Sequence, residues 1–297
     1  MQIPFVTVDV FTDRKFGGNP LAVVPDATGL TSAQMQAIAG EFNLAETTFV
    51  LPPQDPAHTA EVRIFTPRAE LPFAGHPNIG TAYVLAVEAN RAGRALVEPL
   101  VFEEKAGLVR LSLLKEGASL IGARLTPPQS LNRGDDLDAE IIAAACSLSV
   151  NDIETANHQP CILSCGLPLA FVELKTLAAA RPRTDVFTKH LPTDRLIGIL
   201  LYVHDRRGGF DLQVRMFGPL VGVPEDAASG SPNVALGGLL ATLRPEPDLK
   251  LAFRIGQGID MGRPSLLEAA AEKRGGKIVG LSIGGCCVPM MRGVLEV

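Results

Sequence analysis

Apolar and polar residues alternate along several short segments of the chain, and this period of two predicts β-strands. The first half has four such segments and the second half has three, at 5–11, 21–24, 47–51, 62–65, 170–174, 197–203 and 212–217. Thr31-Ser32-Ala33-Gln34 has the pattern of a capping box, which predicts a helix from there to about Phe42. Strands mixed with a few helices indicate an α+β protein.

Two further segments predict helices of an unusual kind, because they have no polar face. They cover 79–89 and 234–243, and each follows a Gly-x-Pro-Asn sequence. A helix that is apolar nearly all round must be enclosed on every side. The pattern therefore predicts two curled, mostly antiparallel sheets, each wrapped around one central buried helix.

The two halves of the chain repeat one another. Residues 18–24 return as 166–172, residues 62–67 as 214–219, and residues 75–78 as 230–233, in the same order. We expect two pseudo-symmetric domains, 1–127 and 128–297, because the Pro- and Gly-containing segment 126–134 interrupts the pattern. A terminal strand that crosses back to the other half is compatible with this division.

Composition narrows the class of protein. Hydrophobic residues make up 46% of the 297 residues and charged residues 20%, which is typical of a globular chain. A net charge of −5, with two Tyr and no Trp, disfavours nucleic acid as a partner. No apolar run is long enough to span a membrane, and the first residues do not resemble a signal peptide, so we expect a cytoplasmic protein.

Cysteine and histidine spacing does not indicate a metal site. The five cysteines are an odd number and are scattered, as are the five histidines, so we expect neither a disulfide framework nor a bound metal. The cysteines are interpreted as small buried hydrophobic residues.

The repeated Gly-x-Pro-Asn sequence suggests a pair of helix starts that bind an anion. Pro77 and Pro232 suit the first helical position, which places His76 and Ser231 at or beside the N-cap. Free N–H groups at two such helix tips would hold a carboxylate between the domains. Two well-capped helices with no ligand are the alternative interpretation.

Three ionisable residues lie near these helix starts. Glu46 opens an otherwise apolar strand, where desolvation would raise its pKa towards that of a general acid/base; an ordinary charge at a strand edge is the alternative. Asp226 follows Glu225 in a loop, where an acidic pair is usually solvated. A histidine such as His76, taken by itself, is more often a capping or core histidine than a catalytic one.

Five motifs resemble those of the PhzF-type phenazine-biosynthesis family over essentially the whole chain. They are 43–50 (NLAETTFV), 65–77 (FTPRAELPFAGHP), 225–231 (EDAASGS), 257–265 (QGIDMGRPS) and the Gly284-Gly285 turn. The resemblance implies a diaminopimelate epimerase-like fold with the active site in the cleft between two domains. It also implies a homodimer and an isomerase that acts on trans-2,3-dihydro-3-hydroxyanthranilate without a cofactor.

The resemblance also implies a role for each site residue. Glu46 would take a proton from one carbon and return it to another, while His76 and Asp226 would hydrogen-bond the substrate and tune proton delivery. Gly230 and Ser231 would bind the substrate carboxylate, and Gly75 would belong to the same site by pseudo-symmetry. Ala227 stands where the family has proline, which leaves the identity of the substrate open.

Rival functions differ in how well the residues support them. Racemases and epimerases of this fold use two cysteines, but Ala74 and Ser229 occupy the corresponding positions, so a two-base mechanism is not expected. A one-base epimerase using Glu46 and a catalytically idle binding protein both remain alternatives. The segment 256–262 is not a G-x-G-x-x-G motif and is interpreted as a turn between late strands.

Overall fold

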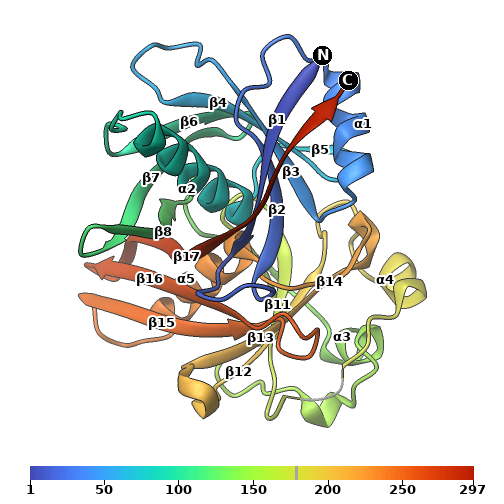
Figure 1. Ribbon diagram of the computed structural model, residues 1–297. Coiled ribbons are helices and arrows are strands. Elements are labelled where there is room, and N and C mark those ends of the chain that lie inside the picture. The colour runs from blue at the N-terminus through green and yellow to red at the C-terminus, as the bar shows by residue number, and fades with distance from the viewer. Residues whose placement is uncertain (178–179) are drawn as a thin grey trace.

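The computed structural model describes residues 1–177 and 180–297, and it has two lobes joined by hydrogen-bonded strands (Figure 1). The strands of the first half are β1 (Gln2–Val10), β2 (Asn19–Val24), β3 (Glu46–Leu51), β4 (Ala60–Phe65), β5 (Glu70–Leu71), β6 (Leu100–Glu104), β7 (Gly107–Glu116) and β8 (Ser119–Thr126). Those of the second half are β9 (Asn132–Asp136), β10 (Cys161–Ser164), β11 (Leu169–Glu173), β12 (Ile199–Val203), β13 (Leu212–Gly218), β14 (Val223–Asp226), β15 (Leu249–Gln257), β16 (Ser265–Arg274) and β17 (Lys277–Glu296).

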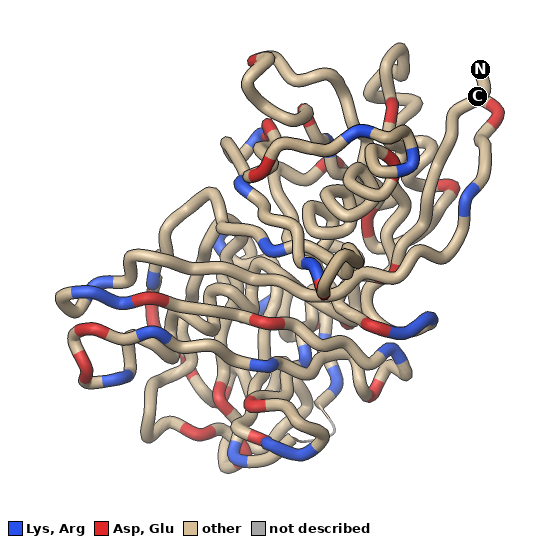
Figure 2. The backbone as a smooth tube through the Cα atoms, turned by 60° about the vertical axis from the view of Figure 1, so that its left-hand side comes forward, with Lys and Arg blue, Asp and Glu red and all other residues tan. Residues whose placement is uncertain are grey.

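The α-helices of the described residues are α1 (Ser32–Phe42), α2 (Gly75–Arg91), α3 (Ala139–Ala145), α4 (Thr184–His190) and α5 (Gly230–Thr242). Short 3₁₀ turns lie at Val150–Asp152, Arg207–Gly209 and Pro219–Val221. None of these helices is long and apolar enough to cross a membrane. Basic and acidic residues are intermingled in both lobes (Figure 2).

Strand pairing repeats in the two halves, as the sequence repeat predicts. In the first half β2 pairs with β3 in parallel, β3 with β4 antiparallel, and β4 with β6 in parallel. In the second half β11, β12, β13 and β15 pair in the same order and with the same directions. The predicted α+β fold with two pseudo-symmetric sheets is thereby confirmed.

Each sheet wraps around one central helix. Helix α2 contacts β1, β2 and β8, whereas α5 contacts β15, β16 and β17. Residues 230–241 of α5 are all buried, which explains why its sequence has no polar face. Full burial of a side chain such as Leu236 contributes roughly 1.5–3 kcal/mol, so packing rather than helix propensity holds this helix in place.

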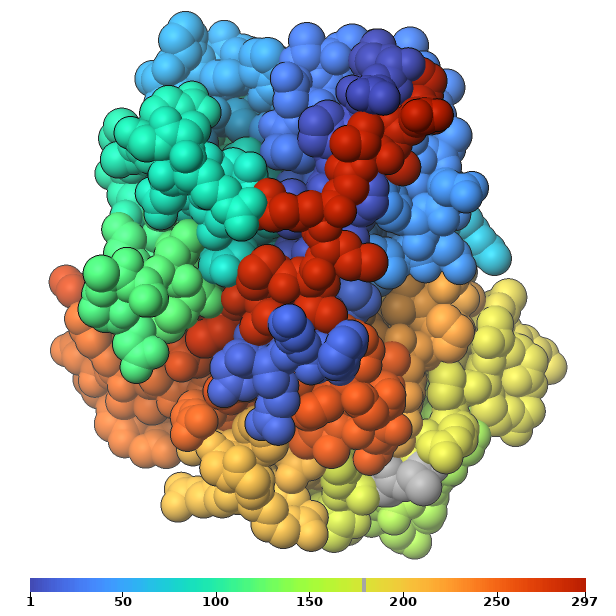
Figure 3. Space-filling view, in the orientation of Figure 1, coloured from blue at the N-terminus to red at the C-terminus, as the bar shows by residue number. Residues whose placement is uncertain are grey.

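Strand β17 connects the two lobes. Its first part pairs with β16 and with β8, and its second part pairs with β1 over Cys287–Glu296. Figure 3 shows it as a red band that runs from the lower lobe to the upper one. The segment 126–134, where the sequence pattern predicts a boundary, leaves β8 and runs into β9. The division at 127/128 stays a prediction, because β17 bonds to strands of both halves.

The predicted start of α1 is confirmed, whereas the predicted starts of α2 and α5 are wrong. Thr31 and Gln34 form the predicted capping box, and α1 ends at Phe42. In contrast, α2 begins at Gly75 and α5 begins at Gly230, so Pro77 and Pro232 are the third helical residues rather than the first. The third N–H of a helix has no intrahelical partner either, so proline is tolerated there and does not mark the helix start uniquely.

Candidate active site

A cavity of about 130 Å³ lies between the two lobes, where the N-termini of α2 and α5 meet. Most of its wall is apolar and comes from both halves: Ala45, Leu71, Leu167, Leu169, Ile197, Met216, Val221 and Val223. The polar groups gather around the helix tips. Such a site suits a small molecule that has an apolar body and one anionic group.

The two helix tips touch through glycines. A Cβ added to Gly75 would lie 2.7 Å from the Cα of Gly230 and 2.8 Å from the backbone N of Ser231. A Cβ added to Gly230 would lie 2.9 Å from the Cα of Gly75. Any other residue type at either position would push the tips apart, so this contact requires glycine on both sides.

The helix tips retain hydrogen-bonding capacity for a ligand. The N-cap residues are Ala74 and Ser229, and neither caps its helix through its side chain. The hydroxyl oxygen of Ser231 is buried and has no hydrogen-bond partner among the described residues. Free N–H groups and the positive ends of both helix dipoles therefore face the cavity, which favours a bound carboxylate.

Glu46 is the first residue of β3 and lies four residues after the end of α1. Its side chain is 14% exposed, and its Oε2 lies 3.3 Å from Nε2 of His76. Burial, and secondarily the negative charge of Asp226, raises the pKa of Glu46 to about 8. The carboxyl group is therefore mainly protonated at neutral pH, as the apolar strand context predicts.

His76 lies in the first turn of α2 and is almost fully buried. Burial lowers its pKa to about 3, so the ring is neutral. The side-chain amide nitrogen of Asn19 lies 3.4 Å from Nδ1 of His76. The two hydrogens of this amide go to Asp226 and to the carbonyl of Ala228, but an N–H group so close to Nδ1 disfavours a proton there and so favours the form with the proton on Nε2, the ring nitrogen nearer to Glu46.

Asp226 ends β14 and is held by donors from both halves. Asn19 Nδ2 donates to its Oδ1 at 2.7 Å, and the hydroxyl of Ser229 donates to its Oδ2 at 2.5 Å. Burial raises the pKa of Asp226 to about 6, and the hydrogen bonds from Ser229 and Asn19 oppose that rise. Asp226 is therefore the carboxyl group that ionises first, and its charge adds to the effect of burial in keeping Glu46 protonated.

Gln257 supports the tip of α5 from behind. Its Nε2 donates to the carbonyl of Asp226 at 2.8 Å and to the hydroxyl of Ser229 at 2.9 Å. Its Oε1 accepts from the backbone N–H of Ser229 at 3.1 Å and from the amide of Asn233 at 2.8 Å. One amide side chain therefore fixes the loop that carries Asp226 relative to the helix that carries Ser231.

The structure brings all six predicted site residues to one cavity. Glu46, Gly75, His76, Asp226, Gly230 and Ser231 line it together, and their individual roles stay predictions. Replacement of the family's proline by Ala227 leaves Asp226 in the site. Sequence reasoning missed Asn19 and Gln257, although both lie in segments that it singled out. The signal that could have found them is a polar residue at the end of a strand: Asn19 opens β2 and Gln257 ends β15.

Comparison with known proteins gives the class and then the family. The model of the "Phenazine biosynthesis-like protein" family matches residues 8–293. An uncharacterized isomerase of Mesorhizobium japonicum is 37% identical over 302 residues, which cover 98% of both chains. The trans-2,3-dihydro-3-hydroxyanthranilate isomerase of Pseudomonas fluorescens is 35% identical over 294 residues, again with 98% of both chains covered.

Among solved structures, a PhzF-family protein of Bacillus anthracis superposes with a TM-score of 0.87 over the full length of both chains, at 24% identity. That likeness shows a common fold. With the sequence relatives, it defines an enzyme of the isomerase class. The chain belongs to the PhzF family of phenazine biosynthesis-like proteins.

Proposed function

We propose that this isomerase moves a proton between two carbons of a small unsaturated or cyclic amino- or hydroxy-carboxylate, of which trans-2,3-dihydro-3-hydroxyanthranilate is the model. The observation that carries the proposal is the position of Glu46. A buried carboxyl group with a strongly raised pKa lines an apolar cavity that also contains two uncapped helix tips. One protonatable group and one anion site are what a proton shift within a bound carboxylate requires.

The residues at the tips of α2 and α5 bind the substrate carboxylate in this proposal. The backbone N–H groups of Gly230 and Ser231 and the hydroxyl of Ser231 are the donors, and Gly75 allows the tips to meet. The apolar wall then surrounds the rest of the substrate and excludes water. The reacting carbons are thereby held beside Glu46.

Glu46 begins the reaction as the ionised carboxylate. With a pKa of about 8, about one molecule in ten has the carboxylate at pH 7. The carboxylate removes a proton from one carbon, and the electron pair of that C–H bond passes into the neighbouring double bond. The new Glu46 carboxyl group then protonates the far end of the conjugated system. The reaction is balanced without an oxidant or reductant.

His76 and Asp226 assist this transfer. Nε2 of neutral His76 lies 3.3 Å from Oε2 of Glu46 without a hydrogen bond between them, and neither atom has another partner among the described residues, so the N–H group is available to a substrate oxygen. Asp226 adds a nearby negative charge, which makes the Glu46 carboxylate a stronger base once it forms.

The test is proton exchange in deuterated water with a panel of small unsaturated carboxylates. We expect an isomerised product, with deuterium at the carbon that gains a proton to the extent that Glu46 exchanges with solvent before it returns the proton. Wild-type protein that neither isomerises nor labels any substrate that it binds would overturn the proposal in favour of a binding protein. Label confined to the carbon that loses its proton would instead indicate a one-base epimerase.

A further inference from the structure

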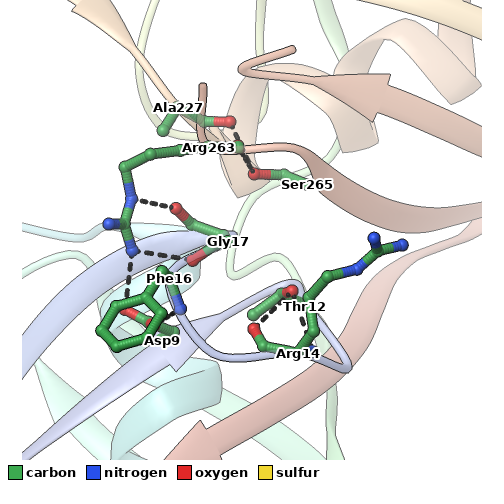
Figure 4. A network of polar contacts seen from close by, with 9 residues as sticks. Asp9, Thr12, Arg14, Phe16, Gly17, Ala227, Arg263 and Ser265 are labelled. Carbon is green, nitrogen blue, oxygen red and sulfur yellow. Dashed lines mark hydrogen bonds and ion pairs between the residues drawn. The ribbon is translucent and has the colours of Figure 1, made fainter. Parts of the chain in front are cut away.

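The loop between β15 and β16 reaches across to the other half of the molecule. Its Arg263 guanidinium donates to the Oδ1 atom of Asp9 at 2.7 Å, to the carbonyl of Gly17 at 2.7 Å and to the carbonyl of Gly18 at 2.8 Å (Figure 4). Asp9 is buried, with 4% of its side chain exposed, and its Oδ2 accepts from the backbone N–H of Phe16. One side chain of the second half therefore satisfies three acceptors of the first, one in β1 and two in the β1–β2 connection.

This connection depends on outside contacts for its shape. Phe16 has a φ of 66° and Gly18 a φ of 63°, in the left-handed region that only glycine adopts freely. A Cβ on Gly18 would lie 2.3 Å from the carbonyl oxygen of Val10, so the turn is tightly closed. The backbone N–H of Gly18 donates to the carbonyl of Pro264, beside Arg263.

The residue that follows this turn is Asn19, which lies behind the cavity rather than in its wall. Asn19 is 2% exposed, and its amide nitrogen donates to Asp226 and to the carbonyl of Ala228 at 3.0 Å. The same nitrogen faces Nδ1 of His76. One amide group thus connects the two side chains that assist Glu46, one from each half.

The same segment also contacts the backbone next to Asp226. Ser265, two residues after Arg263, donates from its hydroxyl to the carbonyl of Ala227 at 2.9 Å (Figure 4). Ala227 follows Asp226 directly. The Arg263–Ser265 segment therefore fixes the backbone beside Asn19 on one side and the backbone beside Asp226 on the other.

We propose that Arg263 is a positioning residue that acts through Asn19: its contacts with Asp9, Gly17 and Gly18 place the Asn19 amide so that His76 carries its proton on Nε2 and Asp226 is held facing the cavity. The role of this geometry in turnover rests on the proposed function. Which nitrogen of His76 is protonated does not depend on the proposed function, so the positioning role and the proposed function can be tested separately.

The direct test is ¹⁵N NMR of histidine-labelled protein, with His76→Gln used to assign the ring. Wild-type protein is expected to show His76 protonated on Nε2, whereas Asn19→Leu and Arg263→Gln are expected to show a mixture of the two neutral forms. Arg263→Lys, which keeps the charge but not the planar fork, is expected to be intermediate. An unchanged His76 signal in both Asn19→Leu and Arg263→Gln would overturn the proposal, whatever the activity of the protein.

Turnover provides the second test. Asn19→Leu and Arg263→Gln are each expected to lower kcat by about tenfold to a hundredfold with a small change in KM, because the carboxylate site is untouched. The double variant is expected to lose no more than Asn19→Leu alone. Losses that multiply would show that Arg263 does not act through Asn19.

Two controls separate positioning from folding. Arg14→Gln removes an exposed arginine of the same connection, whose guanidinium points away from this network, and is expected to match wild type (Figure 4). If Arg263→Gln does not fold because Asp9 is left unpaired, Asp9→Asn/Arg263→Gln removes both charges. That double variant is expected to show the same His76 signal and the same loss of kcat as Arg263→Gln.

Discussion

The two halves of the molecule share a framework but divide the chemistry. Each has an arginine that forms a two-pronged ion pair with a glutamate and lies over a phenylalanine ring, at 5.1 Å in one half and 5.0 Å in the other. These sets are Arg63, Glu70 and Phe65, and Arg215, Glu225 and Phe217. Duplication therefore retained the contacts that hold each sheet together.

The halves differ where β3 and β12 begin. Glu46 precedes Thr47, which pairs with Phe65; the matching residue of the second half is Gly198, which precedes Ile199, the partner of Phe217. A Cβ on Gly198 would lie 2.4 Å from the carbonyl oxygen of Phe217. No side chain fits there, so the second half cannot present an acid opposite Glu46 from this position.

A second difference lies directly after Gly18 and its counterpart Gly166. Asn19 in the first half connects His76 to Asp226, whereas its counterpart Leu167 lines the cavity. One half therefore contributes the carboxyl group that is proposed to transfer the proton, while the other contributes much of the apolar wall and the second carboxyl group.

The largest expected effect comes from removing the acid of the first half. Glu46→Gln is expected to lower turnover at least about a hundredfold while the fold is kept, since an acid/base group contributes on this scale. Steady-state kinetics measures the loss. Glu41→Gln, an exposed glutamate near the end of α1, is the matched control and is expected to match wild type. Activity of Glu46→Gln within a few-fold of wild type would remove the chemical difference between the halves.

The next effect concerns the position that has no room for an acid. Gly198→Ala is expected to destabilise the protein by about 3 kcal/mol, because the added methyl group meets a backbone oxygen that cannot move freely. Chemical denaturation measures the change. Gly40→Ala is the control: its Cβ would meet nothing nearer than 3.7 Å, and alanine favours a helix, so a small gain in stability is expected. Equal effects of the two substitutions would contradict the steric argument.

Glu46 is also expected to destabilise the fold in a pH-dependent way. Its pKa is raised from 4.5 to about 8, so the unfolded chain releases this proton first, and stability is lost as pH rises between these values. Below pH 4.5 both states are protonated and the penalty vanishes. Glu46→Gln is therefore expected to gain about 3–4 kcal/mol over wild type on going from pH 5 to pH 8, measured by denaturation at each pH. A gap that is constant with pH would refute the raised pKa.

The smallest effect comes from the carboxyl group of the second half. Asp226→Asn removes a negative charge that raises the pKa of Glu46, so the rising limb of the kcat/KM profile is expected to move to lower pH by about one unit. Glu225→Gln, which removes the neighbouring acid of the Arg215 ion pair, is the control for a general loss of negative charge. A limb that moves to higher pH in Asp226→Asn would mean that Asp226 does not act on Glu46 through its charge.

Much of this arrangement could be predicted from local patterns. The repeat, the short strands and the apolar helices are visible because each is set by residues close together in sequence. Placing Glu46 at the start of a buried strand needed only the apolar run after it. The helix starts were predicted two residues late, because proline is tolerated at any of the first helical positions.

The rest depends on contacts between distant segments. Asn19 meets Asp226 only because the β15–β16 loop holds the preceding turn, and nothing in the sequence around Asn19 specifies that partner. The partners of Gln257 could not be predicted either, because its four hydrogen bonds go to residues 24 to 31 positions away. The walls of the cavity come from Ile197, Met216 and Val223, whose apolar side chains look like any other core residue in the sequence.

The contact between Gly75 and Gly230 places two positively polarised helix N-termini against each other. Two helix ends of like partial charge are pressed together there, and without a counter-ion they repel each other. A carboxylate bound at these tips, as proposed for the substrate, would relieve this repulsion and so stabilise the contact between the lobes. Small inorganic anions are consequently expected to raise the melting temperature of the free enzyme and to compete with the substrate, by the same interaction.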